Sequence, residues 1–184
     1  MRTRYILAQK DEPLVHNYNY RWRDVSRAEN LPARGFHGGV RYQSGSGQQS
    51  GRWRGKAVLV TTSSTEAKVG DTADHALEVG VQDGMVFTEE GGDFLANARY
   101  QVAYLYDSAG MINGGYKTFT ADDDSKVFAQ FNVRESNWPI LKGDWKFLNG
   151  TGKYQGVTGN GTFEVHFIAS TVLWDVLQGE SKLP

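Results

Sequence analysis

The segment from Gly150 to Phe167 reads "GTGKYQGVTGNGTFEVHF" and combines two signals that favour different folds. Its glycines are typical of a phosphate-binding loop, whereas its last residues alternate between polar and apolar as in a β-strand. A P-loop would require Ser or Thr after Gly152-Lys153, where Tyr154 stands, and a glycine at the position of Phe147. A dinucleotide fingerprint would require a third glycine at Gln155 and a following helix. We therefore interpret the glycines as turn residues with positive φ that precede a strand.

The same alternating pattern recurs along most of the chain. Runs rich in β-branched and aromatic residues, separated by Gly, Asp and Ser, lie at 56–64, 75–88, 96–107, 111–121, 126–133, 143–149, 161–169 and 171–180. Consecutive antiparallel strands of this number close readily into a barrel, because closure leaves no exposed sheet edge. The sequence therefore predicts an all-β fold, an eight-stranded antiparallel β-barrel over residues 51–184 with an N-terminal extension.

Composition agrees with one domain of this kind. The chain has 184 residues, with 22 glycines, only four prolines and 12% aromatic residues, which suits many strands joined by tight turns. It has no cysteine, which excludes disulfides and thiolate chemistry, and no apolar run long enough for a transmembrane helix. No signal-like segment stands at its beginning. We expect a cytoplasmic protein, or a periplasmic or secreted one if a signal peptide was removed.

Residues 1–50 have the composition of an extension, with a linker-like stretch, "QSGSGQQSG", at 43–51. Residues 1–56 carry eleven Lys and Arg against four Asp and Glu, whereas residues 57–184 carry nine against seventeen. A basic arm can bind nucleic acid, but here its charges are scattered singly. This favours docking of the arm on the acidic body of its own chain or of a neighbouring subunit. We expect neither nucleic acid nor a membrane as partner.

Four segments in order carry a family resemblance: "GGDFLANARYQ", "GGYKTFTADDDSKVFAQF", "GDWKFLNGTGKY" and "GTGKYQGVTGNGTFE". Together they resemble the allene-oxide-cyclase-like, calycin-like barrel family, in particular its bacterial members, over roughly residues 52–180. The resemblance implies an eight-stranded barrel, a dimer or trimer, and a hydrophobic small molecule in the lumen. It also implies cofactor-independent chemistry, such as cyclisation of a fatty-acid epoxide, ring formation on polyketides or demethylation of a phenazine.

Glu164 and His166 are two residues apart on the expected last but one strand, so both face one side of the sheet, opposite Phe163 and Val165. If that side lines the lumen, an apolar cavity would raise the pKa of Glu164 and make it a general acid or base. His166 would then orient it or share the proton transfer, with Tyr104 assisting. The alternative is that the polar side is simply the hydrated outside of the barrel.

Other side chains offer ligand contacts. Tyr104, Tyr106 and Tyr116 supply flat walls and phenol groups, as in pockets for planar molecules. Trp174 and Asp175 are adjacent, so only one of them can point inward, and we expect it to be Trp174.

Arg99 faces the same side as Gln101 and is a candidate for holding an anionic or carbonyl group, the alternative being that this side is an exposed strand face. The four histidines show no metal-ligating spacing, and we expect neither a metal nor a cofactor.

The sequence thus predicts a cofactor-independent enzyme, a lyase, isomerase or cyclase. It would act by proton transfer on a small aromatic or polyunsaturated molecule held in the lumen of a homo-oligomeric barrel. Two alternatives remain: a barrel that binds a hydrophobic ligand without chemistry, and an interaction protein that works through its basic arm.

Overall fold

The computed structural model describes residues 50–110 and 113–184, so the predicted arm, apart from Ser50, lies outside the described residues. Eight strands follow one another: β1 (Ser50–Lys68), β2 (Ala76–Glu90), β3 (Arg99–Asp107), β4 (Asn113–Thr120), β5 (Lys126–Asn137), β6 (Ile140–Gly150), β7 (Thr158–Phe167) and β8 (Val172–Lys182). Each corresponds to one predicted segment, and the predicted eight-stranded antiparallel barrel is confirmed. Three strands are longer than predicted. β1 already starts at Ser50, and β5 and β6 extend to either side of the Trp138-Pro139 turn.

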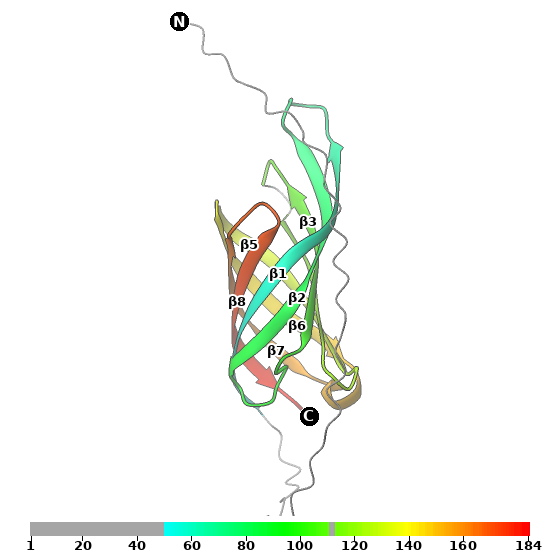
Figure 1. Ribbon diagram of the computed structural model, residues 1–184, viewed down its shortest axis with the longest axis vertical. Coiled ribbons are helices and arrows are strands. Elements are labelled where there is room, and N and C mark those ends of the chain that lie inside the picture. The colour runs from blue at the N-terminus through cyan, green and yellow to red at the C-terminus, as the bar shows by residue number, and fades with distance from the viewer. Residues whose placement is uncertain (1–49, 111–112) are drawn as a thin grey trace, which may run out of the picture. The chain divides into compact units, whose positions relative to one another are not determined.

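Each strand pairs with the next in antiparallel register, and β8 returns to β1 to close the barrel (Figure 1). The β1–β2 hairpin is the longest, and in Figure 1 it projects beyond the other strands at one end of the barrel. In the described part of the chain, no helix is both long and apolar enough to cross a membrane.

The lumen is filled with aromatic side chains at the end opposite this hairpin. Trp53 lies at the centre, with ring centroids 5.7 Å from Trp145 and 5.9 Å from both Phe94 and Phe119, all edge-on. Such edge-to-face contacts suit the aromatic quadrupole and bury large areas. We call this cluster the aromatic plug; its members are Trp53, Phe94, Phe119, Trp145, Phe147 and Tyr154.

The glycines of the opening segment serve two different purposes. Gly152 and Gly156 have φ of 57° and 80°, which confirms them as turn residues: Gly152 begins the 3₁₀ turn Gly152–Tyr154, and Gly156 follows it. Gly159 and Gly161 instead lie within β7. A Cβ on Gly159 would come within 2.8 Å of Phe147, and one on Gly161 within 2.6 Å of Trp145. The same Cβ atoms would come still closer to backbone oxygens of β8, 2.2 Å from that of Glu180 and 2.0 Å from that of Gln178. These two glycines therefore allow close approach of both β8 and the aromatic plug, and the interpretation of every glycine as a turn residue was wrong for them.

Candidate functional site

The barrel lumen contains a cavity of about 430 Å³ between the aromatic plug and the open end. Its lining is mainly apolar and comes from nearly every strand, including Leu59, Val102, Phe131, Leu141, Phe163 and Val165. Cavities of this size and character hold small organic ligands in many proteins.

Three polar side chains meet at the floor of the cavity, next to the aromatic plug. Lys117 of β4 donates hydrogen bonds from Nζ to Asp175 Oδ2 of β8 and to Tyr100 Oη of β3, each 2.6 Å long. Tyr100 Oη in turn donates to Asp175 Oδ2 at 2.7 Å. All three residues are at most 1% exposed, and Lys117 and Asp175 line the cavity. We call Tyr100, Lys117 and Asp175 the floor triad.

The surroundings of the floor triad are almost entirely aromatic. The Tyr100 ring stacks on Phe119 of the aromatic plug, with centroids 4.6 Å apart. Lys117 Nζ lies 4.8 Å from the centroid of Phe131 and 4.6 Å from that of Phe163, within cation–π distance. Burial in this medium lowers the pKa of the Lys117 amine against the opposing effect of Asp175. Burial, followed by the charge of Asp175, raises the pKa of the Tyr100 phenol well above its ordinary value, so the phenol stays protonated at neutral pH.

One oxygen of the floor triad has no partner among the described residues. Oδ1 of Asp175 is buried and accepts no hydrogen bond, whereas Oδ2 accepts two. A buried carboxylate oxygen left without a donor is costly, and native proteins rarely keep one without a reason. This oxygen is therefore an unsatisfied acceptor in a residue that lines the cavity.

A second polar pair lies higher on the cavity wall. Tyr104 of β3 donates a 2.6 Å hydrogen bond to Glu78 of β2, and both line the cavity. The Tyr104 ring lies across Gly80, where a Cβ would approach it to 2.3 Å. Burial, then the hydrogen bond and charge of Glu78, raise the pKa of Tyr104, so this phenol also remains a hydrogen-bond donor at neutral pH.

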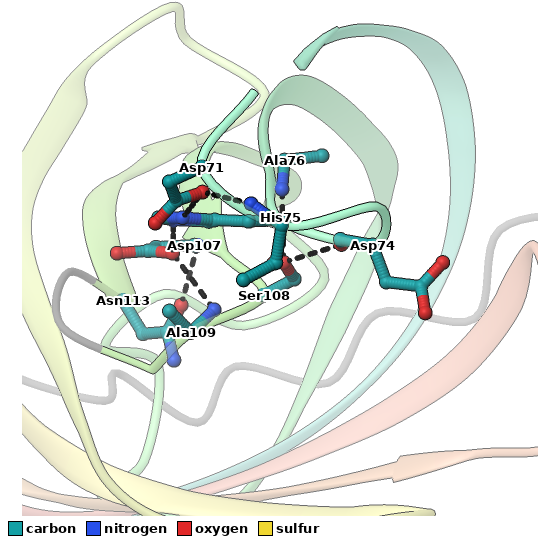
Figure 2. A network of polar contacts seen from close by, with 9 residues as sticks. Asp71, Asp74, His75, Ala76, Asp107, Ser108, Ala109 and Asn113 are labelled. Carbon is teal, nitrogen blue, oxygen red and sulfur yellow. Dashed lines mark hydrogen bonds and ion pairs between the residues drawn. The ribbon is translucent and has the colours of Figure 1, made fainter. Parts of the chain in front are cut away.

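A network of polar contacts joins the β1–β2 and β3–β4 loops at the open end (Figure 2). The His75 ring lies between two carboxylates, with Nδ1 2.7 Å from Asp71 and Nε2 3.0 Å from Asp107. Asp107 also accepts from the backbone N–H of Ala109, and its own N–H donates to Asn113. Both ring nitrogens face carboxylates, and only the imidazolium form can donate a hydrogen bond to each of them. The pKa of His75 is therefore raised, first by the hydrogen bond with Asp71.

Three of the predicted site residues, Glu164, His166 and Trp174, lie together, but on the outside of the barrel. Phe163 and Val165 point into the lumen, so the polar side of β7, with Glu164 and His166, faces outward. Glu164 pairs with Lys142 at 3.0 Å and with His166, and the pKa of Glu164 is lowered, first by the hydrogen bond from Lys142. The predicted acid–base role depended on a lumen position for both residues and on a raised pKa of Glu164, whereas both lie outside and the pKa of Glu164 is lowered.

Trp174 lies on the same outer surface, 5.4 Å from the His166 ring and under the ammonium group of Lys56. The expectation that Trp174 points inward was wrong, because its neighbour Asp175 takes the lumen position, fully buried. The Lys117 ammonium and the Tyr100 hydroxyl compensate this carboxylate, which is why it can be inside.

The remaining predicted contacts divide between the two sides of the wall. Tyr104 and Tyr106 line the cavity, Tyr106 at its open end with 39% exposure. Tyr116 is 57% exposed and does not line the cavity. Arg99 is exposed as well and pairs with Asp124 at 2.9 Å.

Lys117 is absent from the residues predicted from the sequence, and Trp174 was expected in the inward position that Asp175 occupies. A signal was present in both strands. Lys117 is in phase with Gly115 and Phe119, and Asp175 is in phase with Leu173 and Leu177. Two opposite charges, each in phase with the inward residues of its strand, indicate a pair inside the barrel.

Comparison with known proteins gives a likeness in fold. No family model matches the chain, and no curated protein matches it in sequence. Among solved structures, a pterocarpan synthase dirigent protein matches with a TM-score of 0.50 and 12% sequence identity, over 79% of this chain and 99% of that one. At this identity the likeness establishes a shared barrel architecture.

Proposed function

We propose that this barrel is an enzyme that transfers a proton on a small, mainly apolar molecule held in its lumen. The single observation that carries the proposal is the floor triad, a buried Lys–Asp–Tyr cluster with a free carboxylate oxygen at the end of an apolar cavity. Burying such groups is expensive, and clusters of this kind in a cavity favour a functional site over a structural one. A dirigent protein named as a pterocarpan synthase shares the fold, which supports an activity on a small molecule.

Each member of the floor triad has a distinct part in the proposed reaction. Asp175 accepts a proton at Oδ1 from an acidic C–H or an O–H of the substrate. Lys117, beside it, offers positive charge to the oxyanion that forms and carries a proton back to the product. Tyr100 stays protonated and keeps Oδ2 oriented through its hydrogen bond. The proton moves among these side chains and the substrate, as in an isomerase, lyase or cyclase acting on an aromatic or polyunsaturated compound.

The test uses 2-tetralone, an aromatic ketone with acidic α-hydrogens, and follows their exchange in D₂O by NMR. We expect the full-length protein to accelerate exchange, and Asp175→Asn to lower the rate about 100-fold, a typical contribution of general-base catalysis. Glu164→Gln is the matched control, because this carboxyl lies on the other side of the wall, and it should leave the rate unchanged.

Loss of exchange in Glu164→Gln with retention in Asp175→Asn would contradict the proposal. So would exchange no faster than in buffer while 2-tetralone is bound in the lumen. In that case the barrel would be a binding module, with Asp175 Oδ1 acting only as a hydrogen-bond acceptor.

A further inference from the structure

We propose that Lys117 captures aldehydes and ketones in the lumen as an imine, so that the substrate class of the barrel is a small apolar carbonyl compound. This inference rests on the proposed function, because it uses the same cavity and the same Asp175. It adds a covalent step that proton transfer by Asp175 does not itself require.

The geometry of Nζ is the first reason. Nζ donates to Tyr100 Oη and to Asp175 Oδ2, and in the described residues no third hydrogen-bond acceptor contacts it. Once Asp175 has taken a proton, the amine keeps two hydrogens and a lone pair, and rotation about the Cε–Nζ bond turns this lone pair away from Asp175. The remaining side of Nζ faces the rings of Phe131 and Phe163, both of which line the cavity.

The partner of the amine is the second reason. Asp175 Oδ2 is 2.6 Å from Nζ, close enough to take the ammonium proton directly. In a dry, aromatic environment burial penalises the ammonium form of Lys117 and lowers its pKa, which favours release of this proton. Lysines desolvated in this way are the ones that act as nucleophiles towards carbonyl groups.

The chemical step balances with the groups present. After Asp175 takes a proton from Nζ, the amine attacks the carbonyl carbon, and the carbonyl oxygen receives that proton to give a carbinolamine. On addition, the nitrogen also releases a second proton. This proton joins the hydroxyl group of the carbinolamine, which leaves as water, and an iminium remains on Lys117. The net reaction joins an ammonium group and a carbonyl compound into an iminium and one water, with the Asp175 carboxylate as counter-ion.

The other lysines of the described barrel provide an internal comparison. Lys142 and Lys153, for example, have half-exposed side chains paired with Glu164 and Asp123, and their pKa values are raised. At neutral pH such amines are protonated and react slowly with carbonyl groups. Selective reaction at Lys117 is therefore the expected signature.

The experiment incubates the full-length protein with 2-naphthaldehyde and sodium cyanoborohydride at neutral pH, followed by intact-mass and peptide mass spectrometry. We expect about one reduced naphthylmethyl adduct per chain, located on Lys117. Lys117→Arg keeps the positive charge but cannot form an imine, and should lose this adduct. Lys142→Met removes an amine on the outer surface, and should leave it unchanged.

Arginine is larger than lysine, so a second variant guards against failure to fold. Lys117→Met combined with Asp175→Asn removes both charges together, and it should fold and lack the adduct. Adducts spread over the exposed lysines at equal yield, with none enriched on Lys117, would overturn the inference.

The result also separates the two proposals. Exchange of 2-tetralone that depends on Asp175, without an adduct on Lys117, would overturn imine capture and leave the proposed proton transfer standing. An adduct on Lys117 without accelerated exchange would support imine capture and contradict the proton transfer.

Discussion

Two lysine–carboxylate pairs lie on opposite sides of the same barrel wall. Lys117 and Asp175 meet inside at 2.6 Å, with side chains 2% and 0% exposed, whereas Lys142 and Glu164 meet outside at 3.0 Å, with 50% and 38% exposed. The chemical groups are of the same kind, yet the pKa of Lys117 is lowered by burial and that of Lys142 is raised by its carboxylate. The side of the wall, rather than the residue types, therefore determines which pair is suited to proton chemistry.

The largest expected difference between the two pairs is in stability. Asp175→Asn leaves the Lys117 ammonium buried without a counter-charge and should lower the free energy of unfolding by about 3–5 kcal/mol. Glu164→Gln breaks a solvent-screened pair and should have no measurable effect. Chemical denaturation of both variants measures the difference.

The Lys117→Met and Asp175→Asn double variant sharpens this result. It should recover most of the loss seen in Asp175→Asn, because no charge is then left buried alone. Equal stability of Asp175→Asn and the wild-type protein would show that the inner pair is not sealed from water.

The second expected difference is in the titration of the two amines. NMR of ¹⁵Nζ-labelled lysine should show Lys117 losing its proton below the ordinary lysine pKa and Lys142 above it, since burial and ion pairing act in opposite directions. Lys117→Arg identifies the inner resonance. Loss of the Lys117 proton at a higher pH than that of Lys142 would contradict the proposed difference between the two pairs.

A smaller effect is expected at the open end, where His75 joins two carboxylates. Its raised pKa means that the contact stabilises the fold fully below the unfolded histidine pKa of about 6.5, and that this contribution is lost as pH rises through the folded value. Asp71, whose pKa is lowered first by its bond with His75, gives the opposite limit, because its contribution is lost as pH falls through its folded pKa.

The difference in melting temperature between wild type and His75→Gln should therefore be largest in mildly acidic solution and shrink towards pH 9. Thermal denaturation across this range measures it, with His166→Gln on the outer surface as the control. A difference that grows with pH would contradict this account of the network.

The comparison of the two pairs also explains what the sequence could and could not predict. The eight strands could be predicted because their signals, alternation with a period of two and turns rich in Gly and Asp, are visible within each short segment of the sequence. The direction of each strand face depends on partners far along the chain. In "YKTF", Lys117 looks like a solvent-facing residue until Asp175, 58 positions away, is placed beside it. In β7, Glu164 and His166 were predicted to face the lumen as an acid and a base, yet this strand has the ordinary arrangement, with apolar residues inside and polar residues outside.

The most direct test of the central claim is a crystal structure of the full-length protein soaked with 2-naphthol, whose single hydroxyl group can donate a hydrogen bond. We expect the naphthalene rings in the lumen against Phe131 and Phe163, with the hydroxyl oxygen within hydrogen-bond distance of Asp175 Oδ1. Naphthol bound only on the outer surface, beside Trp174 and His166, with an empty lumen, would contradict it.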